Sequence, residues 1–394
     1  MEGQKRIIFN NININQININ KEENLSKKVF IPIKNIKFNR RYFSIIKFFL
    51  FEFFFILLPK GIYSQQHFIE IKVNNIGYNQ IISDNYRGTF PTQIYINGNS
   101  VPFSRNDKKV YVNSIDDLIR LSWTNTTSDF SYMFSNLENI TSVHMNYMLN
   151  NHIIMSYMFY NCSNLESFTY KTSYDISHTI KDMKYMFYNC LSLKSFQFKD
   201  LYMDYYEHIY YKYYNNETDK NVTVDYKNYN YISMSYMFYN CQSLISVNSD
   251  SHIRQYISNM KEMFYNCFSL TTLSLKGIKT DSAIDASYMF YNCSKLEHFS
   301  NSFSNSDIRV NDMKYMFYNC ISLNDAVLSN FKSYSNDQYI SLSNAFYNCY
   351  NLNLINGFSG LYISNINNML YNCTSLVSIN FNPKDVVIKI NMEN

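Results

Sequence analysis

The apolar positions of the chain recur in one short pattern. The hexapeptide Tyr-Met-Phe-Tyr-Asn-Cys is first complete at residues 157–162 and returns, with small changes, down to Cys373. Residues 132–137 form a ninth copy, which ends in Leu137 instead of a cysteine. Successive copies are separated by 25, 28, 51, 26, 26, 27, 29 and 24 residues. A repeat of this length is typical of a solenoid.

Each copy carries two patterns in series. Around Cys190, apolar residues stand at positions 183, 186, 187 and 190, which is the i, i+3, i+4, i+7 spacing of one helix face. The following residues Leu193, Phe196 and Phe198 fit Leu-x-x-φ-x-φ, where φ is apolar, and they alternate with polar residues as in a half-buried strand. We therefore expect an α/β solenoid of about nine strand-helix coils, similar to a leucine-rich-repeat array.

The copies at 183–193 and 313–323 both read Met-Lys-Tyr-Met-Phe-Tyr-Asn-Cys, then Leu or Ile, then Ser and Leu. They resemble the BspA-type leucine-rich repeats of bacterial and protist surface proteins, and the resemblance covers about residues 124–382. It implies an extracellular or cell-surface binding role and no catalytic residue. The sequence departs from the repeat, and irregular coils are expected, at Leu137, in the long step before Cys241, at Ala286 and at Ala345.

Further segments lie around the repeats. Residues 1–40 form a low-complexity leader, and residues 41–64 are predicted to be a signal peptide or an uncleaved signal anchor. The apolar run at 48–58, which Glu52 interrupts, is too short for an ordinary membrane span. Because solenoid ends need covering, the alternating segment 65–123 is expected to be a β-rich N-terminal cap. The remaining assignments are a solenoid at 124–382, an insertion at 201–231 and a C-terminal tail at 383–394.

Charge lies mainly in the leader. Residues 1–64 hold 11 Lys/Arg against 4 Asp/Glu, a net charge of +7. The whole chain carries +4, so the remainder carries −3 and offers no basic field for nucleic acid. We expect contact with a membrane only through an uncleaved N-terminal anchor.

The eight cysteines share one repeat position. If helices carried them, neighbouring cysteines would lie about 8–10 Å apart, whereas a disulfide needs Cα atoms within about 7 Å. This spacing favours a column of buried thiols, although adjacent pairs could close if the coils are flatter. The predicted core column is Cys162, Cys190, Cys241, Cys267, Cys293, Cys320, Cys349 and Cys373.

Seven Asn-x-Ser/Thr sequences follow the signal segment and are candidate glycosylation sites. They are Asn125, Asn139, Asn161, Asn216, Asn221, Asn292 and Asn372.

Tyrosines stand both two and five residues before five of the anchor cysteines. On a 3.6-residue helix these positions lie opposite the buried face, so they predict an exposed stripe. Tyrosine is enriched at interfaces because it joins a large rigid ring to a polar tip. Simple packing between neighbouring coils is the alternative explanation. The stripe comprises Tyr157, Tyr160, Tyr185, Tyr188, Tyr236, Tyr239, Tyr288, Tyr291, Tyr315 and Tyr318.

No familiar catalytic or cofactor motif is present. The chain lacks a nucleophile elbow, a phosphate loop and a dinucleotide fingerprint, and it has no Cys-x-x-Cys pair for zinc. We expect no cofactor and no metal. The predicted function is a secreted or cell-surface scaffold for adhesion or for binding an unidentified protein or glycan ligand, a glycoprotein without catalytic activity. The alternatives are a structural coat that self-associates and a hydrolase whose site escapes motif analysis.

Overall fold

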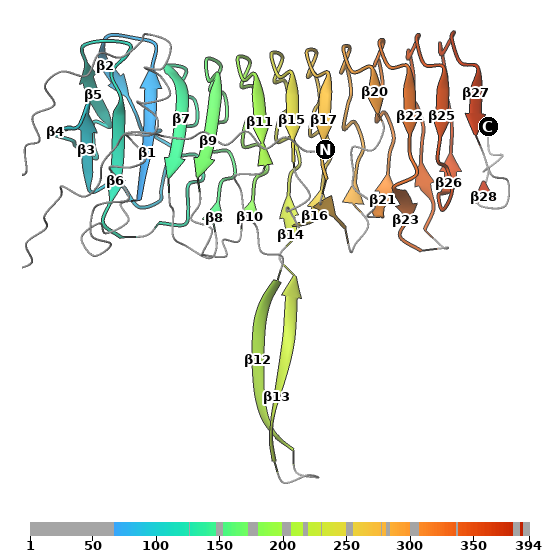
Figure 1. Ribbon diagram of the computed structural model, residues 1–394, viewed down its shortest axis with the longest axis horizontal. Coiled ribbons are helices and arrows are strands. Elements are labelled where there is room, and N and C mark those ends of the chain that lie inside the picture. The colour runs from blue at the N-terminus through green and yellow to red at the C-terminus, as the bar shows by residue number, and fades with distance from the viewer. Residues whose placement is uncertain are drawn as a thin grey trace, which may run out of the picture. The chain divides into compact units, whose positions relative to one another are not determined.

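Figure 1 shows a computed structural model of the chain. It describes residues 67–125, 127–146, 153–171, 180–198, 206–215, 220–229, 231–249, 255–276, 278–280, 284–299, 307–335, 338–380 and 387–388. The leader at 1–40 and the signal segment at 41–64 lie outside these residues, as does all of the tail at 383–394 except β28 (Val387–Ile388).

The repeated hexapeptide forms a chain of tight turns. In the coil of Cys162, the amides of Met158, Tyr160 and Cys162 each donate a hydrogen bond to the carbonyl three residues earlier, at 3.0 to 3.2 Å. The amides of alternate residues leave the coil instead: Tyr157 N–H donates to Lys184 C=O at 3.1 Å, in the next coil. Half of the turn's donors therefore bind within the coil and half bind its neighbour.

The α-helix expected in each coil is wrong. The part of the chain that the structure describes contains no α-helix. Two residues of each turn have positive φ, as at Tyr157 (57°) and Asn161 (59°), and an α-helix requires negative φ throughout. The predicted inward positions Met155, Met158 and Cys162 are nevertheless fully buried. Linked turns thus produce the same i, i+3, i+4, i+7 burial as a helix face.

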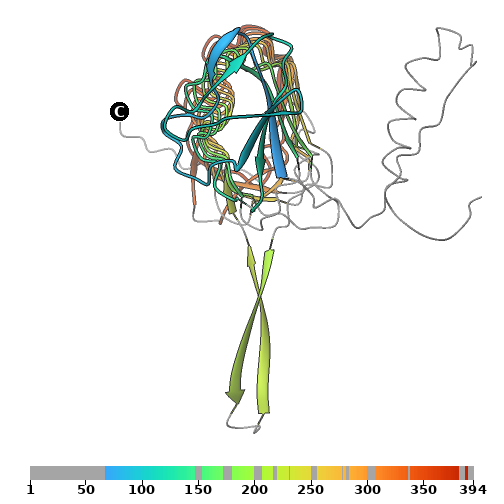
Figure 2. The same ribbon diagram turned by 90° about the vertical axis from the view of Figure 1, so that its left-hand side faces the viewer.

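The spacing between coils explains this correction. Paired strands lie about 4.7–4.9 Å apart, whereas packed helices need about 8–10 Å. A coil that advances by one strand spacing on both of its sides has no room for a helix. Figure 2 looks along the stack and shows the coils superposed as one closed outline.

Each coil contributes short parallel strands on either side of its turn. The strands before the turn are β8 (Ile153–Ile154), β10 (Ile180–Asp182), β14 (Tyr231–Ser233), β16 (Gln255–Asn259), β18 (Ile278–Lys279), β19 (Ile284–Asp285), β21 (Ile308–Asp312), β23 (Phe331–Ser333), β24 (Ile340–Ser341) and β26 (Tyr362–Asn365), and β28, after the last turn, pairs with β26. The strands after it are β7 (Ile140–Asn146), β9 (Ser167–Lys171), β11 (Ser195–Gln197), β15 (Ser246–Asn248), β17 (Thr272–Ser274), β20 (His298–Phe299), β22 (Asp325–Val327), β25 (Leu354–Asn356) and β27 (Ser378–Asn380). Pairing in register stacks equivalent residues, as in Phe196 with Val247 and Val247 with Leu273.

Stacked phenylalanines form the centre of the core. The phenylalanine of each turn lies over that of the next, with ring centroids 5.2 to 5.5 Å apart and ring planes within 9° of parallel. Ala286 and Ala345, where irregular coils were expected, occupy buried methionine positions. Their turns keep the positive φ values of the other copies, at Tyr288 and Asn344. The smaller side chains are therefore accommodated without a change of backbone.

An antiparallel sheet lies at the N-terminal end of the stack. Its strands are β1 (His67–Val73), β3 (Gln93–Ile96), β4 (Asn99–Val101) and β6 (Ile119–Trp123), in the order β4-β3-β6-β1-β7-β9. β2 (Gly77–Gln80) and β5 (Lys109–Val112) form a separate antiparallel pair. β1 pairs antiparallel with β7, and β7 pairs parallel with β9, so one sheet passes from the cap into the solenoid.

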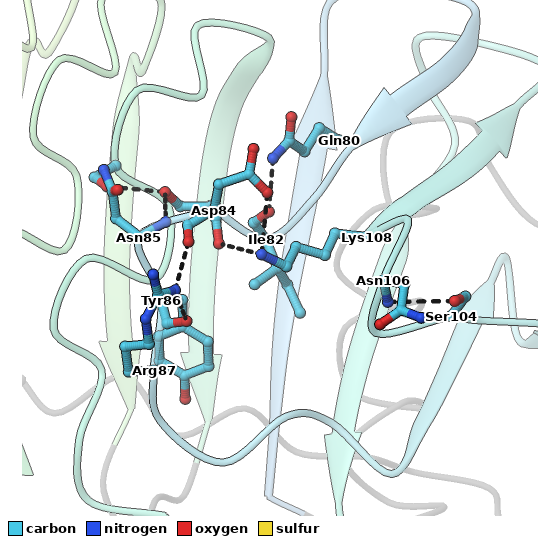
Figure 3. A network of polar contacts seen from close by, with 11 residues as sticks. Gln80, Ile82, Asp84, Asn85, Tyr86, Arg87, Ser104, Asn106 and Lys108 are labelled. Atoms are coloured by element: carbon cyan, nitrogen blue, oxygen red, sulfur yellow. Dashed lines mark hydrogen bonds and ion pairs between the residues drawn. The ribbon is translucent and has the colours of Figure 1, made fainter.

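A turn after β2 closes this end. Ser83 N–H donates to Met133 C=O at 2.8 Å, and the buried Ser83 Oγ is 3.0 Å from Ser135 Oγ. Lys108 Nζ holds the same turn through Ser83 C=O and the Asp84 carboxylate, and its contact with Asp84 is shown in Figure 3. The hydrogen bond from Lys108 lowers the pKa of Asp84. The cap thus supplies the amide that a preceding coil would otherwise donate.

The long step before Cys241 contains a hairpin. β12 (Tyr206–Asn215) and β13 (Lys220–Tyr229) pair antiparallel, from Tyr206 opposite Tyr229 to Asn215 opposite Lys220. Among the described strands they form a sheet of their own, drawn as a two-stranded ribbon in Figure 1. The chain rejoins the stack at β14.

The expected count of nine coils is too high. All nine hexapeptide copies form the turn with two positive φ values. The first copy, however, lies against the cap, and the last leaves Cys373 only partly buried. The solenoid therefore has about seven turns.

Truncating a core ring should test the importance of the phenylalanine stack. Phe238 is fully buried between Phe187 and Phe264. We expect Phe238→Ala to lower the free energy of unfolding by about 3–5 kcal/mol, because it leaves a cavity. The matched variant Tyr239→Ala, in the same turn but partly exposed, should cost clearly less. Urea denaturation followed by circular dichroism measures both, and equal losses would contradict a core centred on phenylalanine.

Candidate functional site: the tyrosine and asparagine face

Two rows of tyrosines run along the outside of the turns. Row 2, two residues before each anchor cysteine, is continuous over eight copies of the hexapeptide, with ring centroids 4.5 to 4.9 Å apart and ring planes within 16° of parallel. Its members are Tyr160, Tyr188, Tyr239, Tyr265, Tyr291, Tyr318, Tyr347 and Tyr371.

Row 1, five residues before the cysteine, is interrupted. Tyr132, Tyr157, Tyr185 and Tyr236 stack in succession, and Tyr288 stacks on Tyr315. Glu262 occupies the coil between these two stacks. Rings of rows 1 and 2 in the same coil meet at an angle, as Tyr157 and Tyr160 do at 48°. The rows therefore form one continuous aromatic surface with a single acidic interruption in its middle.

A row of asparagine side chains lies beside the tyrosines. The asparagine before each anchor position has φ of 58° to 61°, a conformation that asparagine tolerates better than most residues. Its Nδ2 donates to Oδ1 of the preceding asparagine, for example from Asn189 to Asn161 at 2.9 Å and from Asn319 to Asn292 at 2.8 Å. The row extends from Asn136 to Asn372, although Gln242 rather than Asn266 donates to Oδ1 of Asn240. This residue thus serves both the turn and the contact between coils.

Stacking determines what the tyrosine surface can offer. A ring inside a row has a neighbour on both faces, so only its edge and its hydroxyl remain for solvent or a ligand. Partial burial and the adjacent tyrosines raise the pKa of Tyr157 and Tyr291 to about 12. These phenols therefore stay neutral near pH 7 and can both donate and accept hydrogen bonds. The surface suits polar contacts better than stacking on ring faces.

All ten tyrosines of the predicted stripe lie in these rows and are partly exposed. The helical angles from which we placed them are wrong, because positions two and five before the cysteine lie on linked turns. The prediction also missed Tyr265, Tyr347 and Tyr371 of row 2. Each stands two residues before an anchor cysteine, so the repeat position alone would have identified them.

The cysteines lie in a column beneath this face. Seven are buried and Cys373 is partly buried, and all eight are free thiols. Each Sγ lies 2.9 to 3.1 Å from the phenylalanine carbonyl of the preceding coil, and the thiol donates a hydrogen bond to it. Burial raises the pKa of Cys162 to about 12 and that of Cys373 to about 11.

The spacing argument that we used against disulfides does not apply. It assumed helices about 8–10 Å apart, whereas these coils advance by a strand spacing of about 4.7–4.9 Å. Cα atoms at that spacing lie within the limit of about 7 Å that a disulfide can bridge. The observed thiols instead donate to backbone carbonyls of the preceding coil.

The described ranges contain no group of three or more His, Cys, Asp or Glu residues arranged to hold a metal ion. Within the same residues, no helix has the length and apolar character needed to cross a membrane.

Thiol reactivity should follow burial. We expect iodoacetamide at pH 8 to modify Cys373 of the native protein first, because the other seven thiols are shielded and a raised pKa leaves little reactive thiolate. Peptide mass spectrometry measures the order, and denatured protein is the control, in which all eight should react without a reductant. Cysteines that stay unmodified in the denatured control would instead indicate disulfides.

The asparagine row should restrict glycosylation. Nδ2, the atom that carries an N-linked glycan, is directed at the preceding coil in Asn161, Asn292 and Asn372. The Asn139 amide binds Gln80 C=O, whereas Asn125 is exposed. In folded protein from a eukaryotic secretory host, glycopeptide mapping should therefore find a glycan on Asn125 and none on the other four. Full occupancy of Asn161 would contradict this.

Asn216 lies outside the described residues, and Asn221 lies in β13.

Two family models match the chain. Residues 113–217 match the BspA type Leucine rich repeat region (6 copies). Residues 232–358 and 297–392 match the family described as Mycoplasma protein of unknown function, DUF285. No curated protein and no solved structure matches the chain.

These matches confirm the resemblance drawn from the repeat itself. The two models together span most of the stacked coils, and the hexapeptide turn is the same in both regions. The chain is therefore a repeat scaffold of the BspA type, a protein built from BspA-type leucine-rich repeats.

Proposed function

We propose that the chain is a non-catalytic, secreted or cell-surface scaffold that binds a protein ligand along its tyrosine and asparagine face. The observation that carries this proposal is the continuous row 2, in which eight partly exposed rings repeat at 4.5 to 4.9 Å. Its periodic hydroxyls and ring edges form an extended surface of a single chemical kind. BspA-type proteins typically lie at the cell surface or are secreted, which supports the same role.

Stacking favours a protein ligand over a glycan. Sugars bind aromatic side chains largely through contact with ring faces, and the interior rings of row 2 have both faces covered. Hydroxyls and ring edges instead suit the polar and aromatic contacts that are common in protein interfaces. A glycan ligand remains the alternative outcome of the test.

Removing hydroxyls while keeping the rings should test this proposal. The triple variant Tyr239→Phe, Tyr265→Phe and Tyr291→Phe retains the stack but not its polar tips. We expect saturable binding to an array of extracellular proteins by the wild type, and at least about tenfold weaker binding by the variant. The exposed cap residue offers a matched control, Tyr111→Phe, which should bind as the wild type does.

Thermal unfolding should confirm that both variants keep the wild-type stability. Selective binding to a parallel glycan array, with none to proteins, would contradict a protein ligand. Undiminished binding by the triple variant would remove row 2 from the interface.

A self-associating coat is the second candidate, and the last coil supports it. There Cys373, Leu376 and Ile379 are only partly buried, whereas equivalent residues elsewhere are mostly inaccessible. β27 also pairs only with β25 among the described strands. An uncovered edge of this kind can pair with another chain. Sedimentation velocity over a range of protein concentrations distinguishes the two functions, because a coat requires concentration-dependent assembly.

A further inference from the structure

The interruption of row 1 at Glu262 creates a candidate binding site on the tyrosine face. Tyr236 has one ring face covered by Tyr185, at a centroid distance of 4.5 Å. Tyr288 has one ring face covered by Tyr315, at 4.7 Å. The other faces of these two rings border the coil that carries Glu262, since Tyr236 N–H donates to Lys261 C=O and Glu262 N–H donates to Ser287 C=O. Two aromatic faces therefore flank one carboxylate.

The distance between coils sets the separation of the Tyr236 and Tyr288 rings. One coil step separates stacked tyrosines by 4.5 to 4.9 Å. Two steps of a strand spacing put the Tyr236 and Tyr288 rings about 9–10 Å apart. A cation midway between them would lie about 5 Å from each centroid, within the range of about 6 Å for a cation–π interaction.

The local charge is negative. Glu262 accepts a hydrogen bond from the Tyr236 hydroxyl at 3.2 Å, and Asp285 lies one coil further along. Partial burial raises the pKa of Glu262, and the negative charge of Asp285 adds to this effect. Lys261 is the cation closest in sequence. Within the part of the chain that the structure describes, no ion pair reaches Glu262 or Asp285.

Other coils neutralise the equivalent acid. Asp182 pairs with Lys184 at 3.3 Å, and Asp312 pairs with Lys314 at 3.0 Å, in both cases two residues later. After Asp285 the same position is Ser287, which supplies no charge. The two adjacent coils therefore carry two carboxylates and one lysine, Lys261, although Lys314 of the next coil also interacts electrostatically with Asp285.

A buried hydroxyl in the same coil also lacks a partner. Ser287 is fully buried, and its Oγ makes no hydrogen bond to the described residues. The equivalent serines Ser235 and Ser343 bind the hydroxyls of Ser233 and Ser341. The coil next to Glu262 thus departs from its neighbours in both charge and hydrogen bonding.

We propose that Glu262, between Tyr236 and Tyr288, binds the ammonium or guanidinium group of a lysine or arginine side chain on a protein ligand. The carboxylate provides the ion pair, the two ring faces provide cation–π contacts, and Asp285 adds negative potential. This inference rests on the proposed function, because it names the chemistry of the partner at one point of the tyrosine face.

A titration with short peptides tests the site. The probes are acetylated and amidated Gly-Lys-Gly and Gly-Arg-Gly, and a peptide with acetylated lysine is the neutral control. We expect the tyrosine ring signals of the wild type to shift in NMR spectra with both basic peptides and not with the neutral one. Glu262→Tyr should weaken binding at least about tenfold. It should fold, since tyrosine already occupies this positive-φ position in six other copies.

Asp182→Asn is the matched control. It removes one carboxylate from the same repeated position as Asp285, in a coil where that carboxylate is already paired with Lys184. Its affinity for the basic peptides should stay within about twofold of the wild type. Thermal unfolding of both variants separates a loss of the site from a loss of the fold.

Three results would overturn the inference. They are equal affinity of the wild type and Glu262→Tyr, equal binding of the acetylated-lysine peptide, and tighter binding of n-butylammonium than of the lysyl peptide. The last would assign the site to free amines rather than to a protein. The protein array distinguishes this failure from that of the proposed function, because row 2 can bind a protein even if the peptides do not bind at Glu262.

Discussion

Backbone hydrogen bonds between successive turns are the constraint on which the rest of the structure depends. Alternate amides of every hexapeptide except the last donate to the next coil, as Phe159 N–H does to Met186 C=O at 2.9 Å. This pairing holds the turns at nearly the spacing of strands in a sheet, and it does so in register. Any residue repeated in the sequence is thereby placed over its equivalent. The rows of phenylalanine, tyrosine, asparagine and cysteine all follow from this one geometric condition.

The same condition limits the chemistry of the outer surface. Rings held 4.5 to 4.9 Å apart cover one another's faces, so a surface rich in tyrosine presents mainly edges and hydroxyls. A single replacement then has a large local effect. Where Glu262 replaces tyrosine, Tyr236 and Tyr288 each keep a single stacking partner in row 1, and a carboxylate lies between their coils. In a repeat protein, departures from the repeat are therefore the natural places to look for specificity.

The two ends of the stack differ because the cap contacts the first coil, whereas no described coil follows the last one. At the N-terminal end, Ser83 and the antiparallel strand β1 provide the contacts that a preceding coil would make. At the last described coil, Leu376 and Ile379 remain partly exposed. A solenoid buries its core only between neighbours, so residues of the last described coil are less buried than their equivalents in the interior.

The sequence by itself determined the repeat, its phase and its inward-facing residues. Met183, Met186 and Cys190 are buried as their spacing predicts, because periodic burial depends only on which positions are apolar. Only the tertiary structure decided the backbone that achieves this burial. Helices and linked turns can show the same i, i+3, i+4, i+7 pattern, and the choice between them depends on the distance to the neighbouring coil. That distance arises from strand pairing between residues about 26 positions apart, so no local pattern reveals it. The stacking that covers the tyrosine faces follows from the same distance.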